Sequence, residues 1–207
     1  MPITRLDPTL WLLVLLLTGA ATGCTHVNKV PSYEVGPYPA REKHNLKVEL
    51  RVPDELRRSE FQQSILGSRF KIVLGENLTR NSELVTKSVF SYVSVSDSLA
   101  EQRKEIVDAT LTPRLIFVDE TKGLWTVSQL TLTIALEWSL RDVGGNIVWI
   151  ATMKGEGKSA EGGFLRSESS RLTDTRIKMA LDDLFQKSFQ AMSSSPEIKA
   201  FSVLKQK

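Results

Sequence analysis

The chain has few of the side chains that reactive or metal-binding sites need. Its 207 residues include one cysteine, Cys24, and two histidines, His26 and His44. A single cysteine excludes an internal disulfide, so hydrophobic packing has to stabilise the folded body. Both histidines precede the part of the chain with regular hydrophobic patterns, which argues against a Ser-His-Asp arrangement there. One cysteine and two histidines are also a poor set of metal ligands. We therefore expect neither a metal nor a cofactor.

Charge of one sign is not in large excess. The chain has 27 Lys and Arg against 24 Asp and Glu, a net charge of +3, and the two signs are mixed along its length. Without a basic cluster we expect no nucleic acid partner. Beyond residue 24 no apolar run is long enough to span a bilayer. Any attachment to a membrane would therefore have to involve the N-terminal segment.

The N-terminal segment carries the one strong motif of the sequence. Arg5 precedes an apolar run at residues 10–17, which leads into Ala21-Thr22-Gly23-Cys24. The run is too short for a permanent transmembrane helix but fits the apolar core of a secretory signal. This segment resembles a bacterial lipoprotein signal peptide with its lipobox. The alternative is a plain signal peptide cut near Ala20 or Ala21.

The lipoprotein resemblance implies a membrane anchor. Residues 1–23 would be removed, and Cys24 would carry a thioether-linked diacylglycerol and an amide-linked acyl chain. Such chains anchor a protein stably, because each buried methylene contributes about 0.8 kcal/mol. Thr25 follows the cysteine, where an Asp in enterobacterial lipoproteins favours the inner membrane. The resemblance thus implies a lipid-anchored protein of the cell outer membrane that faces the periplasm.

Composition divides the rest of the chain. Proline-rich, non-periodic sequence up to residue 45 predicts that residues 24–45 form the lipidated cysteine and an extended tether. Periodic patterns over residues 46–195 predict a single domain, which leaves residues 196–207 as a C-terminal tail.

The body shows strand and helix patterns in alternation. From residue 130 to 140, apolar side chains occupy every even position, which predicts a long antiparallel strand with one buried face. Two glycines within residues 142–146 predict a hairpin turn into a return strand at 147–151. Further strands are expected at 46–52, 92–95 and around 111–117, and helices at 75–90, from 173 or 174 to about 195, and in a short piece at 59–66.

This order of elements predicts an α+β two-layer sandwich. A mainly antiparallel sheet of four to five strands would be covered on one face by two helices. The expected core consists of Leu132, Ile134, Leu136 and Trp138 from the long strand and Leu181, Leu184, Phe185 and Phe189 from the last helix.

One motif suggests nucleotide binding but lacks a required residue. Gly155-Glu156-Gly157-Lys158-Ser159 matches the end of a phosphate-binding loop, whose first glycine would stand where this chain has Thr152. The following residues also do not start a helix promptly, so no helix N-terminus would face a phosphate. We therefore expect no nucleotide, and a flexible Gly-rich loop at 155–163.

Paired carboxylates are the remaining candidates for catalysis. Asp119-Glu120 and Asp182-Asp183 fall where a solvated strand end and a solvated helix face are expected. Such positions predict charged surface rather than an acid–base pair. We therefore expect no enzymatic activity.

Four residues are candidate contacts for a partner. Lys154, Lys158 and Arg166 give the expected loop a mild positive bias, and Trp125 stands at a strand start, where an aromatic side chain can anchor a partner. A solvated connector and a core or edge-covering tryptophan are the alternatives.

The order of elements behind a lipid anchor resembles that of small envelope-assembly lipoproteins. The similarity covers about residues 46–195 at the level of topology, and the relatives are the lipopolysaccharide-assembly lipoprotein and the lipoprotein activator of penicillin-binding proteins. It implies a non-enzymatic scaffold or assembly factor with an envelope protein as partner. The alternative is a carrier for an amphiphile, such as a lipid or lipopolysaccharide, in an apolar cavity between helices and sheet.

Overall fold

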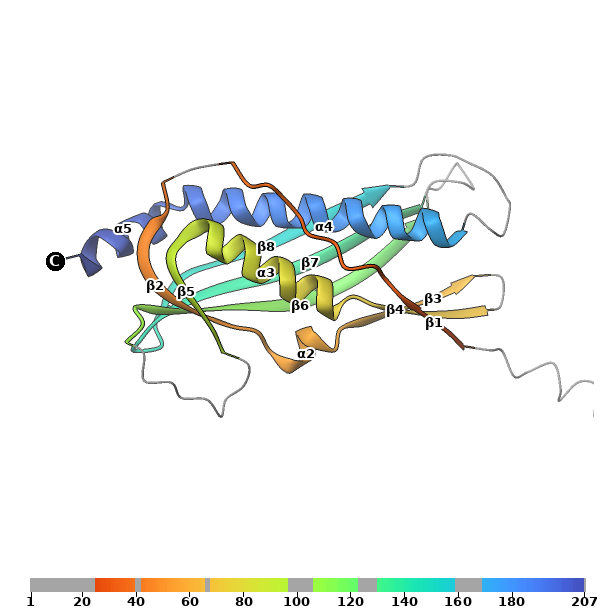
Figure 1. Cartoon of the computed structure of the whole chain (residues 1–207), viewed down its shortest axis with the longest axis horizontal. Helices are drawn as coiled ribbons and strands as arrows, with labels where there is room; N and C mark the ends of the chain where they lie inside the picture. Colours follow the sequence, from red (N-terminus) through yellow and green to blue (C-terminus); the bar gives the residue numbers. More distant parts are fainter. Residues whose placement is uncertain are drawn as a thin grey trace, which may run out of the picture.

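A five-stranded mixed sheet forms the centre of the protein (Figure 1). The computed structural model describes residues 25–39, 42–65, 68–96, 106–122, 130–158 and 169–206. β2 pairs in parallel with β5 and β6, whereas β6, β7 and β8 form an antiparallel meander. In spatial order the strands are β5 (Phe90–Ser96), β2 (His44–Arg51), β6 (Ala109–Lys122), β7 (Leu130–Asp142) and β8 (Ile147–Lys158).

The alternating pattern of the long strand is confirmed in β7. Its even-numbered side chains from Leu132 to Leu140 are buried, and most of the odd-numbered side chains between them are only partly buried. The hairpin to β8 turns at Gly145, whose φ of 83° favours glycine. Asn146 N–H and its Nδ2 donate to the two carboxylate oxygens of Asp142, at 2.8 and 3.0 Å. These hydrogen bonds lower the pKa of Asp142 below its ordinary value.

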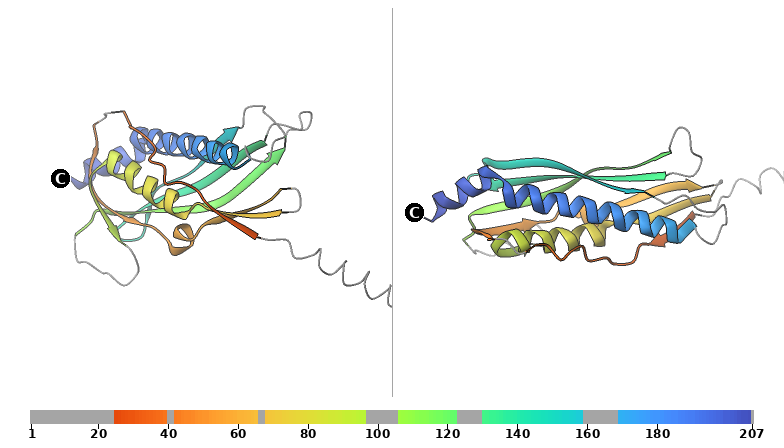
Figure 2. Two further views of the ribbon diagram at one scale, coloured as in Figure 1. Left: turned by 45° about the vertical axis from the view of Figure 1, so that its right-hand side comes forward. Right: turned by 90° about the horizontal axis from the view of Figure 1, so that it is seen from above.

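Two helices cover one face of the sheet (Figure 2). α3 (Gly75–Val89) contacts β5 and β2, and α4 (Ser169–Ser194) lies along β8 and β7. The expected α+β two-layer architecture is therefore correct, although α4 starts a few residues before the expected cap at 173 or 174. All eight predicted core residues are buried: Leu132, Ile134, Leu136, Trp138, Leu181, Leu184, Phe185 and Phe189.

A second sheet of three strands was not expected from the sequence. Its order is β1 (Thr25–Lys29), β4 (Ser68–Val73) and β3 (Glu60–Ile65), and a short helix α2 (Asp54–Arg57) precedes β3. The helix expected at residues 59–66 is wrong, because every residue of β3 is paired with β4 instead. That pairing supplies hydrogen-bond partners for the backbone groups of this segment.

The expected C-terminal tail is mostly helical. α5 (Pro196–Lys205) follows α4 after one residue, Ser195, whose Oγ accepts a hydrogen bond from Ile198 N–H at 3.2 Å. Proline is favourable at the first helical position, since its missing N–H would have no partner there. Ile198 is fully buried, so α5 belongs to the folded body.

Candidate functional site

The segment expected to be a free tether is packed on the body. After β1, residues 30–39, here called the strap, run in extended form across α3 and α4 (Figure 1). Val30 and Val35 are buried in the main core, and the Tyr38 ring stacks on Phe189 of α4 with centroids 5.0 Å apart. Burial, with a smaller effect from the Asp182 carboxylate, raises the pKa of Tyr38 above its ordinary value. The tether prediction is therefore wrong over residues 25–39.

Two asparagines one helical turn apart hold the strap in place. Asn77 Oδ1 accepts from Tyr33 N–H at 2.7 Å, and its Nδ2 donates to the Pro31 carbonyl at 3.1 Å. Asn81 repeats this pattern with Val35 N–H at 2.7 Å and the Tyr33 carbonyl at 2.8 Å. The side-chain amides thus offer the strap the donor and acceptor that a neighbouring β-strand would provide. Both asparagines are buried, and no pattern in the sequence indicated that they hold another segment.

The two lysines proposed as partner contacts lie on a strand rather than a loop. Lys154 and Lys158 are exposed on β8 and point to the same side of the sheet. Lys154 Nζ lies 5.6 Å from the centroid of the Phe117 ring, and Lys158 Nζ lies 3.6 Å from Glu156. The acidic neighbour offsets the positive bias expected from the sequence. The other three candidate residues, Cys24, Trp125 and Arg166, lie outside the described residues.

The flexible glycine loop is likewise wrong for residues 155–158. Gly155 and Gly157 pair with Ile134 and Leu132 of β7 and are buried beneath α4. A methyl group on Gly155 would come within 2.0 Å of the Ala180 carbonyl oxygen, and one on Gly157 within 1.8 Å of that of Arg176. Glycine is required here because strand and helix backbones approach each other closely.

Side chains of α4 also bond to the outer backbone edge of β8. Glu156 N–H donates to Asp183 Oδ2 at 3.0 Å, and Lys187 Nζ donates to the Lys154 carbonyl at 3.0 Å. Asp183 and Lys187 are themselves joined at 2.6 Å. These bonds occupy backbone groups to which another strand could otherwise add. The Asp183 carboxylate is therefore partly exposed on the helix surface and is bonded to β8 and to Lys187.

A buried ion pair joins the start of α4 to the sheet. Arg176 of α4 pairs with Glu120 of β6, and both side chains are almost completely shielded from water. Glu120 thus belongs to the helix-facing side of the sheet, contrary to the solvated strand end expected for Asp119-Glu120. A buried pair of this kind fixes the position of the helix more than it stabilises the fold.

The opposite face of the sheet carries no covering layer among the described residues. We call it the outer sheet face and define it by the outward residues of β6, β7 and β8. Charged pairs such as Arg114–Glu137, at 3.0 Å, alternate here with exposed apolar side chains. Those apolar residues are Ile116, Phe117, Ile147 and Ile150, each more than a third exposed.

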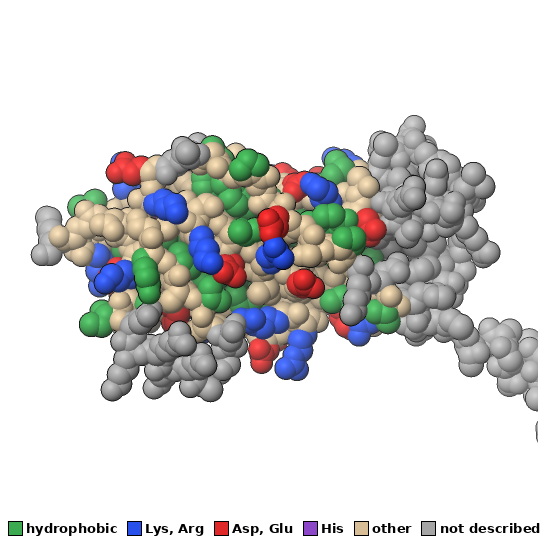
Figure 3. All heavy atoms as spheres, viewed as in Figure 1, with side chains coloured by type: hydrophobic (Ala, Val, Ile, Leu, Met, Phe, Trp, Pro, Cys, Tyr) green, Lys and Arg blue, Asp and Glu red, His purple; other side chains and the backbone are tan. Residues whose placement is uncertain are grey.

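The helix-bearing face differs from the outer sheet face. Acidic and basic side chains are interspersed over it without a patch of one sign (Figure 3).

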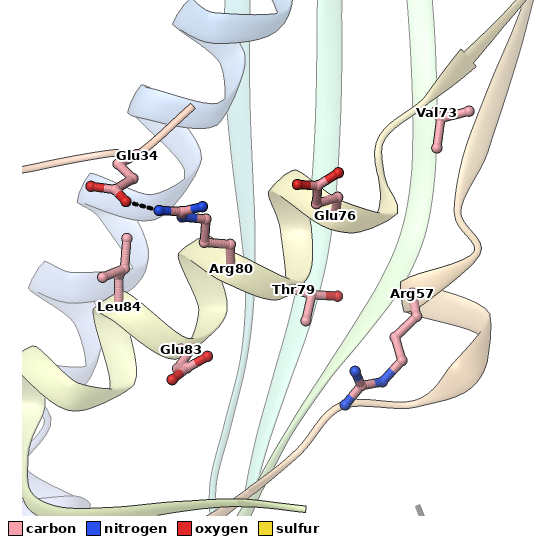
Figure 4. A pocket seen from close by; sticks show the side chains of 8 residues that line it. All are labelled: Glu34, Arg57, Val73, Glu76, Thr79, Arg80, Glu83 and Leu84. Atoms are coloured by element: carbon pink, nitrogen blue, oxygen red, sulfur yellow. Dashed lines mark hydrogen bonds and ion pairs between the residues drawn. The ribbon is translucent and has the colours of Figure 1, made fainter. Parts of the chain in front are cut away.

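A pocket of about 660 Å³ lies beside α3 (Figure 4). It is lined by Glu34, Arg57, Val73, Glu76, Thr79, Arg80, Glu83 and Leu84. Glu34 and Arg80 pair with each other, so this mixture of charges does not favour one ligand.

The described residues offer little for metal or membrane chemistry. Within these ranges no group of three or more His, Cys, Asp or Glu side chains could hold a metal ion. No helix of the described part is both long and apolar enough to cross a bilayer.

The architecture defines a class of helix-covered, mixed-sheet α+β proteins, and a solved structure shares it. A protein from Xanthomonas campestris, of the family DUF330, superposes with a TM-score of 0.52 at 10% identity, covering 79% of this chain and 91% of that one. At this identity the similarity establishes a common fold only.

Other comparisons are weaker. A minor lipoprotein from Acinetobacter baumannii matches with a TM-score of 0.42 at 14% identity, over 74% of this chain and 94% of that one. The PelC dodecamer from Paraburkholderia phytofirmans gives 0.41 at 14% identity, over 76% and 95%. No known family model and no curated protein matches the sequence.

Proposed function

We propose that the protein is a lipid-anchored, non-enzymatic scaffold of the bacterial cell envelope. Its anchor is Cys24, and it faces the periplasm from the outer membrane. The lipobox-like sequence before Cys24 supports the anchor, and anchoring raises the effective concentration of the domain for partners at the same membrane.

The close packing of α4 against the sheet favours a scaffold over a carrier for an amphiphile. A carrier would need an apolar cavity between these layers. Instead, Gly155 and Gly157 bring β8 directly against α4, and the Trp138 and Phe185 rings meet edge to face with centroids 6.5 Å apart. The pocket beside α3 has no lining residue from α4 or from the five-stranded sheet, and five of its eight lining residues are charged.

The outer sheet face is the surface that we assign to the envelope protein partner. It presents exposed apolar side chains, Phe117 and Ile150 among them, next to ion pairs. Apolar groups within a polar surround are typical of protein interfaces. The opposite face of the sheet is already covered by α3, α4 and the strap.

The anchor is tested by Cys24→Ser. We expect the variant to lose incorporation of labelled fatty acid and to move from the membrane to the soluble fraction of the envelope. Retention in the membrane fraction with undiminished labelling would contradict the proposal.

The docking face is tested by site-specific photo-crosslinking in cells. A crosslinking side chain at Ile150, on the outer sheet face, should give a discrete adduct with another envelope protein. The matched control is Met179 on α4, which is similarly exposed, at 45% against 50% for Ile150. Equal yields of the same adduct from both positions would remove the assignment.

A further inference from the structure

We infer that the domain sits directly on the lipid bilayer, with the end that contains the start of β1 against the membrane. The inference rests on the proposed lipidation of Cys24. Thr25, the first residue of β1, follows Cys24 by one peptide bond, and adjacent Cα atoms are about 3.8 Å apart. The lipid would thus be joined to a strand of the fold without a flexible spacer.

β1 is attached firmly to the rest of the fold, so a lipid joined to β1 would fix the position of the whole domain at the membrane. All five of its residues are in register with β4, from Thr25 opposite Arg69 to Lys29 opposite Val73. The strap continues the attachment through buried Val30 and the hydrogen bonds to Asn77 and Asn81. Detaching β1 and the strap from the body to form a spacer would expose apolar side chains and leave buried amides without partners, which is unfavourable.

The position of Thr25 defines which end faces the membrane. Figures 1 and 2 place the start of β1 at the same end as the β3–β4 hairpin, the close of β6 and β8 and the start of α4. We call this the anchor end and define it by Thr25, Ile65, Ser68, Lys122, Leu130, Lys158 and Ser169. Val27 of β1 lies close to it and is 58% exposed, so an apolar side chain is available to the lipid surface there.

The other end of the domain is far from the membrane in this arrangement. β7 starts at the anchor end and reaches the β7–β8 hairpin at Asp142 after 13 residues. At roughly 3.3 Å per residue, this strand spans about 40 Å. The hairpin residue Val143, 70% exposed, therefore marks the distal end.

The absence of a second cysteine makes the inference directly measurable. Since the only native cysteine would be acylated, Lys158→Cys and Val143→Cys each provide one free thiol for a fluorophore. Lipidated protein would be placed in phosphatidylcholine vesicles that contain lipids with nitroxide-labelled headgroups. We expect strong loss of fluorescence at position 158 and little or none at position 143.

A spacer variant provides the control. About ten Gly and Ser residues inserted between Cys24 and Thr25 have a root-mean-square span of roughly 17 Å. The insertion should reduce quenching at position 158 towards the level at position 143. Equal quenching at the two positions without the spacer, or quenching at 158 that the spacer leaves unchanged, would overturn the inference.

Sedimentation of the same vesicles separates the two proposals. If the protein carries no lipid and stays in the supernatant, the proposed function fails, and this inference fails with it. If the protein sediments with the vesicles but both labels respond alike, the anchor stands and the direct seating on the membrane is wrong.

Discussion

Trp138 and Ser188 share a hydrogen bond in the centre of the core. Trp138 Nε1–H donates to Ser188 Oγ at 3.0 Å, and both side chains are completely buried. Ser188 Oγ–H in turn donates to the Leu184 carbonyl at 2.8 Å. The serine thus allows the largest core side chain of β7 to face α4 without an unpaired indole N–H.

Ser188→Ala should leave that indole N–H buried without a partner. We expect a loss of about 1–3 kcal/mol in the free energy of unfolding. Urea denaturation measures the effect, with Ser139→Ala on the outer side of β7 as the control. Equal stability of the two variants would mean that the hydrogen bond contributes nothing.

A second set of variants tests which side chains of β7 face the core and which face outward. Leu136→Ala and Phe185→Ala each remove a fully buried side chain and should cost about 2–5 kcal/mol. Glu137→Ala breaks only the partly exposed ion pair with Arg114, so it should cost less than about 1 kcal/mol. Thermal and urea unfolding should therefore separate the two kinds of variant clearly.

The close approach of β8 to α4 predicts that alanine is harmful at glycine. Gly155→Ala and Gly157→Ala would each place a methyl group against a helix carbonyl oxygen, at a cost of about 1–3 kcal/mol or more. Lys158→Ala, one residue further on the exposed side, should have almost no effect. Wild-type melting temperatures for both glycine variants would restore the view of residues 155–158 as a flexible loop.

The hydrogen bonds from Asn77 and Asn81 to the strap predict that the strap can be loosened without unfolding the rest of the domain. Asn77→Ala or Asn81→Ala should speed hydrogen exchange of the Tyr33 or Val35 amide, respectively, because each loses its acceptor. The control is Arg80→Ala, which lies between the two asparagines on α3 and removes only an exposed ion pair with Glu34. Unchanged exchange in both asparagine variants would mean that these side chains do not hold the strap.

The Asp142–Asn146 contact predicts a pH dependence. Hydrogen bonds to the carboxylate lower the pKa of Asp142, so its contribution to stability is present above the unfolded pKa and is lost as the pH falls through the folded pKa. Asn146→Ala should raise the titration midpoint of Asp142, followed by NMR. A midpoint that does not move would assign the shift to another cause.

The sequence predicted the elements whose signal is local. Alternation at residues 130–140 revealed β7, because a strand with one buried face must repeat every second residue. The apolar stripe around Leu181 and Phe185 indicated α4, because a helix with one buried face repeats its apolar residues about every 3.6 positions.

The strap and the β8 glycines depend on contacts between distant segments, which leave no period. Val30 and Val35 lie in a proline-containing segment without periodicity, and the two asparagines that bond to the strap, Asn77 and Asn81, follow more than forty residues later. Glycines at 155 and 157 are favourable in loops, so only the presence of α4 explains them as strand residues. The sequence therefore predicts a loop at 155–163 that includes Lys158, whereas in the structure Lys154 and Lys158 are both exposed residues of β8.

The contact of the strap with α4 has a consequence for the order of folding. Synthesis proceeds from the N-terminus, so the strap leaves the ribosome long before Phe189, on which Tyr38 stacks. Contacts of such large sequence separation form late, because a long loop must close first. The first segment of the domain to be made is therefore among the last to reach its native position. Until α4 is complete, Tyr38 lacks the aromatic ring on which it stacks, and this interval is when a chaperone would be most needed.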